Sequence, residues 1–258
     1  FATFLIVVAV IVVFHLKTLP REPGAPTPSI FLSPSNVKAM LVGLTSEAIL
    51  VVGMAIVIVG GGFDISVGSV LALAGLVTVQ TLKVGAPLPI GILCGLLAGA
   101  ACGLINGLFI AHLGMSPLIA TLGMMMAARG LVTLHVHQYG AASSEDLPAS
   151  FLYLGQGKVY DTQGFWIVVI AFAVVLIGDV LLRNLRWLRQ VYYIGGNERA
   201  AALSGINVPR VRTITYVICG VTAAIAGILN SARFGTATYE AGMGLELQVI
   251  AECVIGGA

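Results

Sequence analysis

Long apolar runs separated by polar stretches form the main pattern of this chain. A helix needs about 20 mostly apolar residues to cross a bilayer, and eight runs of the sequence approach or exceed that length. They are residues 1–16, 40–59, 67–82, 89–112, 117–134, 165–182, 213–230 and 245–258. The first, third and last are short. The pattern predicts an all-α polytopic membrane protein with about eight transmembrane segments in this chain.

Three polar stretches divide these runs. Residues 17–39 hold five of the ten prolines, residues 135–163 carry acidic and histidine side chains, and residues 183–212 carry six of the thirteen Lys and Arg. Basic residues concentrate in cytoplasmic loops, so we expect 183–212 to be cytoplasmic. Counting spans from there places 17–39 and 135–163 outside the cytoplasm. We expect residues 1–258 to form a single membrane domain that is truncated at both ends.

Composition supports a membrane protein. The chain is 58% hydrophobic and only 9% charged, with a mean hydropathy of +1.02, whereas soluble domains carry about 25% charged residues. The net charge of +2 argues against nucleic-acid binding. We interpret the four cysteines as buried apolar side chains, because all lie in apolar runs and none forms a CxxC pair. His135 and His137 lack an evident third ligand, so no metal site is predicted.

Glycine recurs every fourth residue in the fourth run. The stripe consists of Gly91, Gly95, Gly99, Gly103 and Gly107. Small residues let two membrane helices approach closely and pack by dispersion. With 3.6 residues per turn, the stripe drifts by about 40° at each step and winds around the helix. We predict that it serves helix packing and is not a site.

Residues 60–66 interrupt an otherwise continuous apolar stretch. Three successive glycines, Gly60 to Gly62, break the helix, and Asp64 and Ser66 follow as good N-caps. Two interpretations stay open. The segment is a broken helix whose start faces a water-filled path, as in transporters, or Asp64 merely caps a helix at the cytoplasmic edge.

A short capped helix is predicted in the basic stretch. Asn197 is placed to cap it, Glu198 to complement its positive end, and Gly205 to supply a left-handed stop. Pro209 prevents continuation. The helix presents small side chains and suits docking into a groove of a partner; the alternative is an ordinary ordered loop.

The stretch Gly61-Gly62-Phe63-Asp64-Ile65-Ser66-Val67-Gly68-Ser69 closely resembles the "GGIDLSVGS" signature of permease subunits from the ribose/galactose/xylose class of ABC importers. Four further stretches match in the same order. They are residues 103–108, 119–124 with Arg129-Gly130, 195–206, and 241–257. The resemblance spans nearly the whole chain. Two departures stand out, because the family usually has Ile at Phe63 and a small or apolar residue at Glu252.

The resemblance implies a permease bundle of about ten segments, of which this chain lacks about two. It implies two permease chains, identical or different, that form the pathway in the bacterial inner membrane. A cytoplasmic ATPase would bind ATP and Mg, and a periplasmic or lipid-anchored binding protein would deliver a ribose-, galactose- or xylose-like monosaccharide or similar small polar solute. The chain itself would break no covalent bond and hold no cofactor.

The same resemblance assigns roles to individual residues. Residues 197–204 would form the coupling helix that contacts the ATPase, through Gly196, Asn197, Glu198, Arg199, Ala201, Ala202, Ser204 and Gly205. Candidates for the solute pathway are Asp64, Ser66, Asn106, Thr121, Asn230 and Glu252. For each single polar group, hydrogen bonding between helices is the competing role. We expect Arg129 to snorkel or pair and not to bind solute.

Other functions stay open. An ABC permease of this kind fits nucleosides, autoinducer-like furanoses or branched-chain amino acids. An ion-coupled secondary transporter or channel would need titratable groups in the membrane, and Asp64 and Glu252 are the only good candidates. A scaffold without transport activity is disfavoured by the interruption at residues 60–62.

Overall fold

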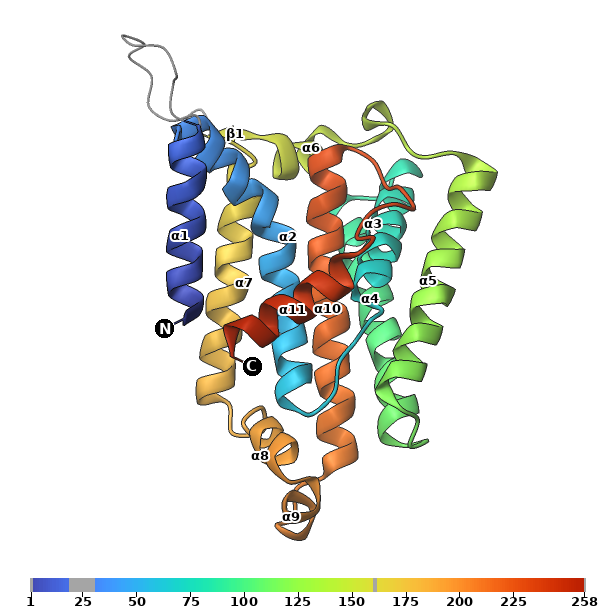
Figure 1. Cartoon of the computed structure of the whole chain (residues 1–258). Coiled ribbons are helices and arrows are strands. Elements are labelled where there is room, and N and C mark those ends of the chain that lie inside the picture. The colour runs from blue at the N-terminus through green and yellow to red at the C-terminus, as the bar shows by residue number, and fades with distance from the viewer. Residues whose placement is uncertain (1, 19–30, 160–161, 258) are drawn as a thin grey trace. The chain divides into compact units, whose positions relative to one another are not determined.

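The computed structural model describes residues 2–18, 31–159 and 162–257. Within them the regular elements are helices apart from one short hairpin (Figure 1). The elements are α1 (Ala2–Lys17), α2 (Pro34–Val59), α3 (Val67–Lys83), α4 (Leu88–Ala111), α5 (Pro117–Tyr139), the 3-10 helix η1 (Ser144–Asp146), α6 (Ala149–Gln156), β1 (Lys158–Val159), β2 (Thr162–Gln163), α7 (Phe165–Asn184), α8 (Gln190–Gly196), α9 (Glu198–Leu203), α10 (Val208–Phe234) and α11 (Leu245–Gly256). The chain divides into two compact units, residues 1–44 and 45–258.

The first unit contains α1 and the beginning of α2. The rings of Phe14 and Phe31 stack with their centroids 5.6 Å apart, and the Asn36 amide donates to the Phe31 carbonyl at 2.8 Å. The helix α2 begins at Pro34, within the proline-rich stretch 17–39 and before the apolar run 40–59. Proline fits the first turn, where its missing N–H has no partner to lose. Residues 19–30 lie outside the described residues.

Each predicted apolar run contains a helix. In the described chain, α2, α4, α5, α7 and α10 are long and apolar enough to cross a membrane. This confirms an all-α polytopic membrane protein. The other three helices at predicted runs are shorter: α1 has 16 residues, α3 has 17 and α11 has 12. The helix α10 begins at Val208 and not at residue 213, because Asn207 caps it and Pro209 occupies its first turn.

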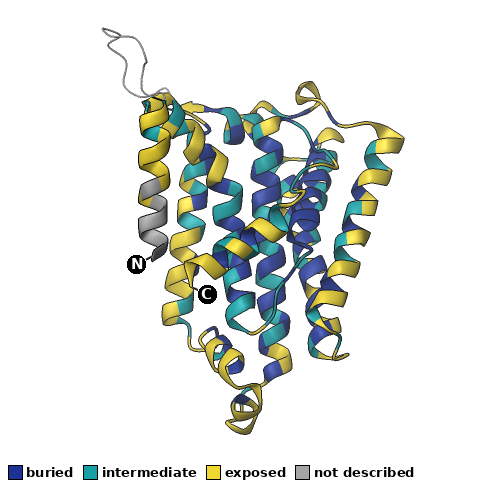
Figure 2. Ribbon diagram, viewed as in Figure 1, coloured by how far each residue is buried: buried dark blue, intermediate teal, exposed yellow. Residues whose placement is uncertain are grey.

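The helices α10 and α3 lie at the centre of the second unit. Both are largely buried, whereas α5 and α7 expose much of their surface (Figure 2). Small side chains make this packing close, since Ala223, Ala224 and Ala226 of α10 are all 0% exposed. The exposed faces of α5 and α7 are apolar, as expected of surfaces that meet lipid.

The glycine stripe of α4 lies against two neighbours. Gly91 and Gly95 face α3, where an added Cβ would lie 2.6 Å from a methyl of Leu82 and 3.0 Å from the Ala74 carbonyl. Gly99, Gly103 and Gly107 face α10. The stripe passes from one neighbour to the other because it winds around α4. All five glycines therefore stand at close helix contacts.

The polar stretches of the second unit lie at opposite ends of α10. At its C-terminal end, the Gln156 amide donates to the Arg233 carbonyl at 3.1 Å, and Lys83 pairs with Asp146 at 3.1 Å, which lowers the pKa of Asp146 by a hydrogen bond from the ammonium group. At its N-terminal end lie α8 and α9 (Figure 1). Twenty-seven residues of α10 separate these ends by about 40 Å.

Both polar stretches are more ordered than predicted. Residues 135–163, expected to be a loop, contain the end of α5, the helix α6 and the β1–β2 hairpin. The core side chain Phe151 explains α6, since it is 0% exposed and anchors that helix. In residues 183–212, α8 precedes the predicted short helix because Val191 and Ile194 are buried.

Candidate functional site

The interruption at residues 60–66 turns the chain back into the bundle. The helix α2 ends at Val59, and Gly61 takes a left-handed conformation with φ +78°. The Tyr216 hydroxyl of α10 donates to the Phe63 carbonyl at 3.2 Å, which holds the non-helical segment against the central helix. The helix α3 then starts at Val67 and runs about 25 Å to the end that carries α6.

Asp64 is the centre of a buried hydrogen-bond cluster. It is 2% exposed, and its Oδ1 accepts from the backbone N–H of Ser66 at 2.8 Å and from the Ser66 hydroxyl at 2.5 Å. The Asn106 amide of α4 donates to Asp64 Oδ2 at 3.4 Å and to Ser66 Oγ at 3.0 Å. The carboxyl thus organises the segment instead of pointing to solvent.

The predicted capping role of Asp64 and Ser66 is wrong in detail. Ser66 stands at the N-cap position of α3, but its hydroxyl makes no cap hydrogen bond, because it donates to Asp64. Asp64 in turn accepts from the backbone two residues ahead, which is the pattern of an Asx turn. Thr121 of α5 joins the cluster by accepting from the Ile65 N–H at 3.3 Å.

Little space lies between the interruption and α8. A cavity of about 10 Å³ lies beneath the interruption, near the smallest space that holds one water molecule. Its walls are residues of α2, α8 and α10 and of the interruption, namely Val57, Gly60, Gly62, Val191, Ile194, Val211, Arg212, Thr215 and Tyr216. This conformation has no room for a solute there.

Of the six candidate pathway residues, four therefore come together: Asp64, Ser66, Asn106 and Thr121. Asn230 is half-buried on α10, 14 residues after Tyr216 and so about 21 Å further along the helix. Glu252 lies elsewhere, on α11.

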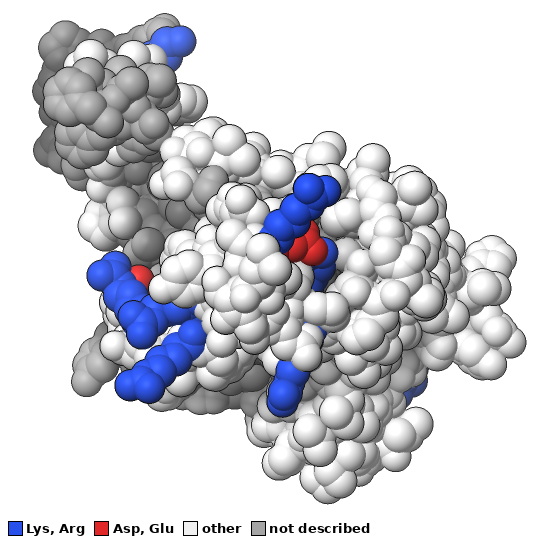
Figure 3. Space-filling model, turned by 90° about the horizontal axis from the view of Figure 1, so that it is seen from below, with Lys and Arg blue, Asp and Glu red and all other residues white. Residues whose placement is uncertain are grey.

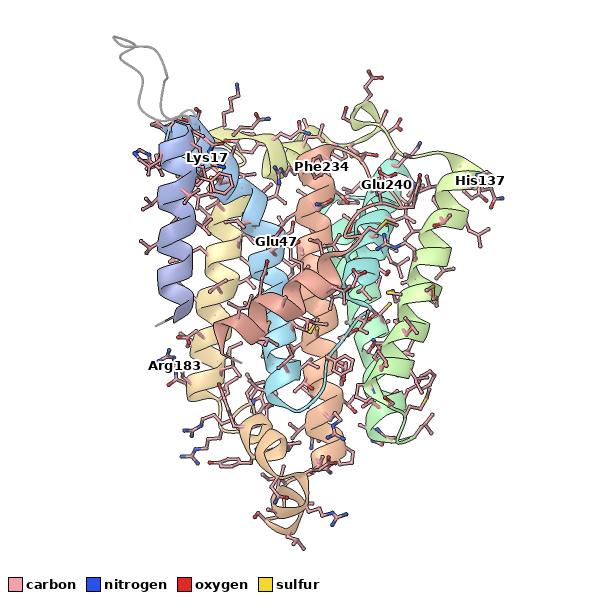
Figure 4. The ribbon with its side chains drawn as sticks, viewed as in Figure 1. Lys17, Glu47, His137, Arg183, Phe234 and Glu240 are labelled. Atoms are coloured by element: carbon pink, nitrogen blue, oxygen red, sulfur yellow. The ribbon has the colours of Figure 1, made fainter. Side chains whose placement is uncertain are left out.

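Glu252 belongs to a separate polar group. The Gln248 amide donates to its Oε1 at 3.1 Å, and Glu47 of α2 faces both side chains. Figure 4 shows Glu47 where α11 crosses α2, a crossing also marked by the contact of Cys253 Sγ with the Val51 carbonyl at 3.8 Å. Glu47 lies midway along α2, a 26-residue helix that is long and apolar enough to cross a membrane.

The short helix α9 has the predicted caps. The Asn197 side chain accepts from the Ala200 N–H at 3.0 Å, and Gly205 takes φ +85° after the helix. Two hydrogen bonds from Arg212 to the Glu198 carboxylate, at 2.8 and 3.3 Å, join α9 to α10. This bidentate pair gives α9 a fixed orientation on the first turns of α10.

The prediction that Ala201 presents its side chain to a partner is wrong. Ala201 is 4% exposed and packs into a cluster with Leu188, Val191, Ile194, Val208 and Val211. Leu203, two residues after Ala201, is 90% exposed. It was not among the predicted contact residues of the short helix, although an apolar residue two positions before the helix-ending Gly205 could have indicated it.

The surface around α9 is basic and hollowed. An open groove of about 760 Å³ lies beside the helix. Its walls are Ala111, Gly196, Asn197, Glu198, Arg199, Ala202, Val208, Pro209 and Arg212. Figure 3 shows Lys and Arg side chains gathered on this end of the molecule. In the described residues no group of three or more His, Cys, Asp or Glu side chains forms a metal site.

Comparison with known families decides the class of the protein. Residues 36–258 match the family described as "Branched-chain amino acid transport system / permease component". The chain belongs to this permease family. The match includes the interruption, the glycine stripe and α9, so the features described above lie within the shared region.

The relatives of this permease include proteins named for sugar import. It is 36% identical over 232 residues to the ribose import permease protein RbsC of Escherichia coli (strain K12), covering 88% of this chain and 70% of that protein. The D-allose transport system permease protein AlsC of the same strain is 32% identical over 267 residues, covering 100% and 75%. The L-arabinose ABC transporter permease protein AraH of Azospirillum brasilense is 33% identical over 228 residues, covering 88% and 66%. No solved structure matches the chain.

The permease has a second non-helical segment, which lies between the predicted runs 213–230 and 245–258. Residues 235–244 run from α10 to α11, and Gly242 packs against Gly68 at the start of α3, where an added Cβ would lie 3.2 Å from the Gly242 carbonyl carbon. The Arg129 guanidinium of α5 donates to the carbonyls of Tyr239 and Ala241, the latter at 2.7 Å. Only the folded chain brings these distant residues together.

Proposed function

We propose that this permease is the membrane subunit of an ABC importer that moves a monosaccharide, or a similar small polar solute, across the bacterial inner membrane. The observation that carries the proposal is the similarity to permeases named for ribose, allose and arabinose, which covers 88% or more of this chain. The candidate residues of the interruption and of α9 all lie in the matched region.

Coupling to a separate ATPase is supported by the end that carries α9. There Leu203 projects from a rigid helix beside a groove, and arginines surround both. ATP and Mg would be bound by the ATPase and not by this chain. The periplasmic or lipid-anchored binding protein would dock at the opposite end, on the side of α6, and deliver the solute.

Two side-chain hydrogen bonds connect α9 to residues 60–66 through α10. Arg212 of α10 holds Glu198 of α9, and Tyr216, one turn further along α10, holds the Phe63 carbonyl. A displacement of α9 by the ATPase would therefore tilt α10 and pull on residues 60–66. We propose that this movement of α9, α10 and residues 60–66 opens and closes the pathway near the Asp64 cluster.

The membrane arrangement that we propose has eight segments, of which α3 and α11 enter only part of the bilayer. Residues 60–66 and 235–244 would then be interruptions that approach from opposite sides and meet at Gly68 and Gly242. Non-helical backbone within the membrane requires protein or a water-filled path around it. The polar groups on α11 and Glu47 need the same protection, and a second permease chain, identical or different, would supply it.

Reconstitution tests this function. The permease, its ATPase and its binding protein would be placed in liposomes, and uptake of labelled D-ribose, D-allose and L-arabinose would be measured with and without ATP. We expect uptake of at least one sugar that requires ATP and all components. Uptake that persists without the ATPase would show an ion-coupled transporter, and uptake of none of the sugars would remove the proposed solute class.

A further inference from the structure

Arg129 projects from α5 into the junction of α3 and residues 235–244. Its Nε donates to the Ser69 hydroxyl at 3.2 Å, and its Nη1 donates to the carbonyls of Tyr239 and Ala241. These contacts use one side of the guanidinium. Within the part of the chain that the structure describes, Nη2 has no hydrogen-bond partner.

Glu246 approaches the same junction from the first turn of α11. Its Oε2 is buried and, among the described residues, lacks a hydrogen-bond partner. It reaches this position because residue 68 is glycine: an added Cβ there would lie 2.6 Å from Oε2. Ser69, next to Gly68 on α3, accepts from Arg129 Nε at 3.2 Å.

Arg129 Nη2 is a donor and Glu246 Oε2 is an acceptor, but the two do not pair with each other. The Glu246 carboxylate acts electrostatically on the Arg129 guanidinium, yet the ion pairs found in the described chain do not include them. A buried acceptor without a hydrogen-bond partner, such as Glu246 Oε2, is costly. A group that accepts from Nη2 and donates to Oε2 at once would satisfy both, and a hydroxyl group has this property.

We propose that Arg129 and Glu246 bind a hydroxyl group of the passing solute, with Arg129 donating to its oxygen and Glu246 accepting its proton in a hydrogen bond. Both side chains are half-buried, and Tyr239 beside them is 44% exposed. The junction therefore borders the face that carries residues 235–244 and α11. The site suits uncharged polyhydroxylated solutes and rests on the proposed function.

The test compares Glu246→Gln with the unchanged permease in the reconstituted importer, using D-ribose and its 2-, 3- and 5-deoxy analogues. For each sugar the ratio of the two uptake rates is taken, so the preference of the binding protein cancels. We expect about a tenfold ratio for D-ribose, because a neutral amide oxygen replaces the charged acceptor of the hydrogen bond. For one deoxy analogue we expect a ratio near one, since the hydroxyl that Glu246 binds is then absent.

Glu240→Gln serves as the matched control, because Glu240 is exposed on the same segment, and its ratio should stay near one for every sugar. Arg129→Lys keeps the charge and should show the same dependence on one hydroxyl, which covers the case that Glu246→Gln does not assemble. A ratio near one for D-ribose, or one equal ratio for all four sugars, would overturn the proposal. If the unchanged permease moves no sugar, the proposed function itself fails.

Discussion

A missing Cβ sets the distance between the backbones of α4 and α10. At Gly103 an added Cβ would lie 2.9 Å from the Tyr216 carbonyl carbon and from Val217 Cα, and at Gly99 it would lie 2.6 Å from the Ala224 methyl. Backbone atoms cannot rotate away as a long side chain does. These glycines therefore carry a packing constraint that Gly123 and Gly130 of α5 do not share, since nothing lies within 4 Å of an added Cβ there.

The same substitution at two glycines should have opposite effects. Gly103→Ala should lower the free energy of unfolding by about 1–3 kcal/mol, the usual cost of overpacking. Gly123→Ala on α5 should be neutral or stabilising, because nothing lies within 4 Å of its added Cβ and alanine favours the helix. Denaturation of the purified variants in detergent measures both. Equal destabilisation would contradict the packing role of the stripe.

Tyr216 links the central helix to the interruption through one hydrogen bond. Tyr216→Phe removes the hydroxyl that donates to the Phe63 carbonyl while keeping the ring, which is 1% exposed. We expect the amount of solute moved per ATP hydrolysed to fall several-fold, because residues 60–66 no longer follow α10. Tyr153→Phe, at a 54% exposed position of α6, is the control. Unchanged coupling in Tyr216→Phe would exclude transmission of the movement of α10 to residues 60–66 through this hydrogen bond.

Local chemistry explains which residues the sequence could reveal. Asn197 and Gly205 act on the backbone within a few residues, so their roles were readable without the fold. The burial of Ala201 was not, because it depends on α8 and the start of α10 folding over it. Arg129 and Glu246 stand far apart in the sequence and meet only when residues 235–244 fold back onto α3.

At the scale of elements, each apolar run became a helix because its own backbone hydrogen bonds satisfy it in lipid. Short elements behave differently. The helices α6, α8 and α9 have 8, 7 and 6 residues, too few for stability alone. Each is held by burying its own side chains against other elements, namely Phe151 of α6, Val191 and Ile194 of α8 and Ala201 of α9. Apolar periodicity thus predicted the long helices and missed α6 and α8.

The exposed tip of α9 gives a prediction for a whole element. Leu203→Asp should weaken binding of the ATPase by about 30-fold or more, since a central apolar contact is typically worth 2 kcal/mol or more and a charge would be buried instead. Leu203→Met keeps an apolar side chain and should bind normally. Copurification and titration of the ATPase with detergent-solubilised permease measure this. Normal binding by Leu203→Asp would mean that the ATPase engages another surface.

At the scale of the whole molecule, the proposed function requires the two ends of α10 to face different compartments. The arginine-rich end with α9 and the end with α6 are separated by about 40 Å along α10, a distance that matches a bilayer with its headgroups. The excess of arginines at the α9 end indicates the cytoplasmic side. Only that orientation lets an ATPase reach Leu203.

Labelling of single cysteines decides the orientation. Cys102, Cys219 and Cys253 are buried, so replacing the half-buried Cys94 by alanine leaves a background of low reactivity. In this background, Glu145→Cys, at an exposed position before α6, should react with a membrane-impermeant maleimide added to intact spheroplasts. Leu203→Cys should react only in inside-out vesicles, where the cytoplasmic face is open to the reagent. The reverse pattern would place α9 outside the cell, beyond the reach of any ATPase, and the proposed coupling would then be impossible.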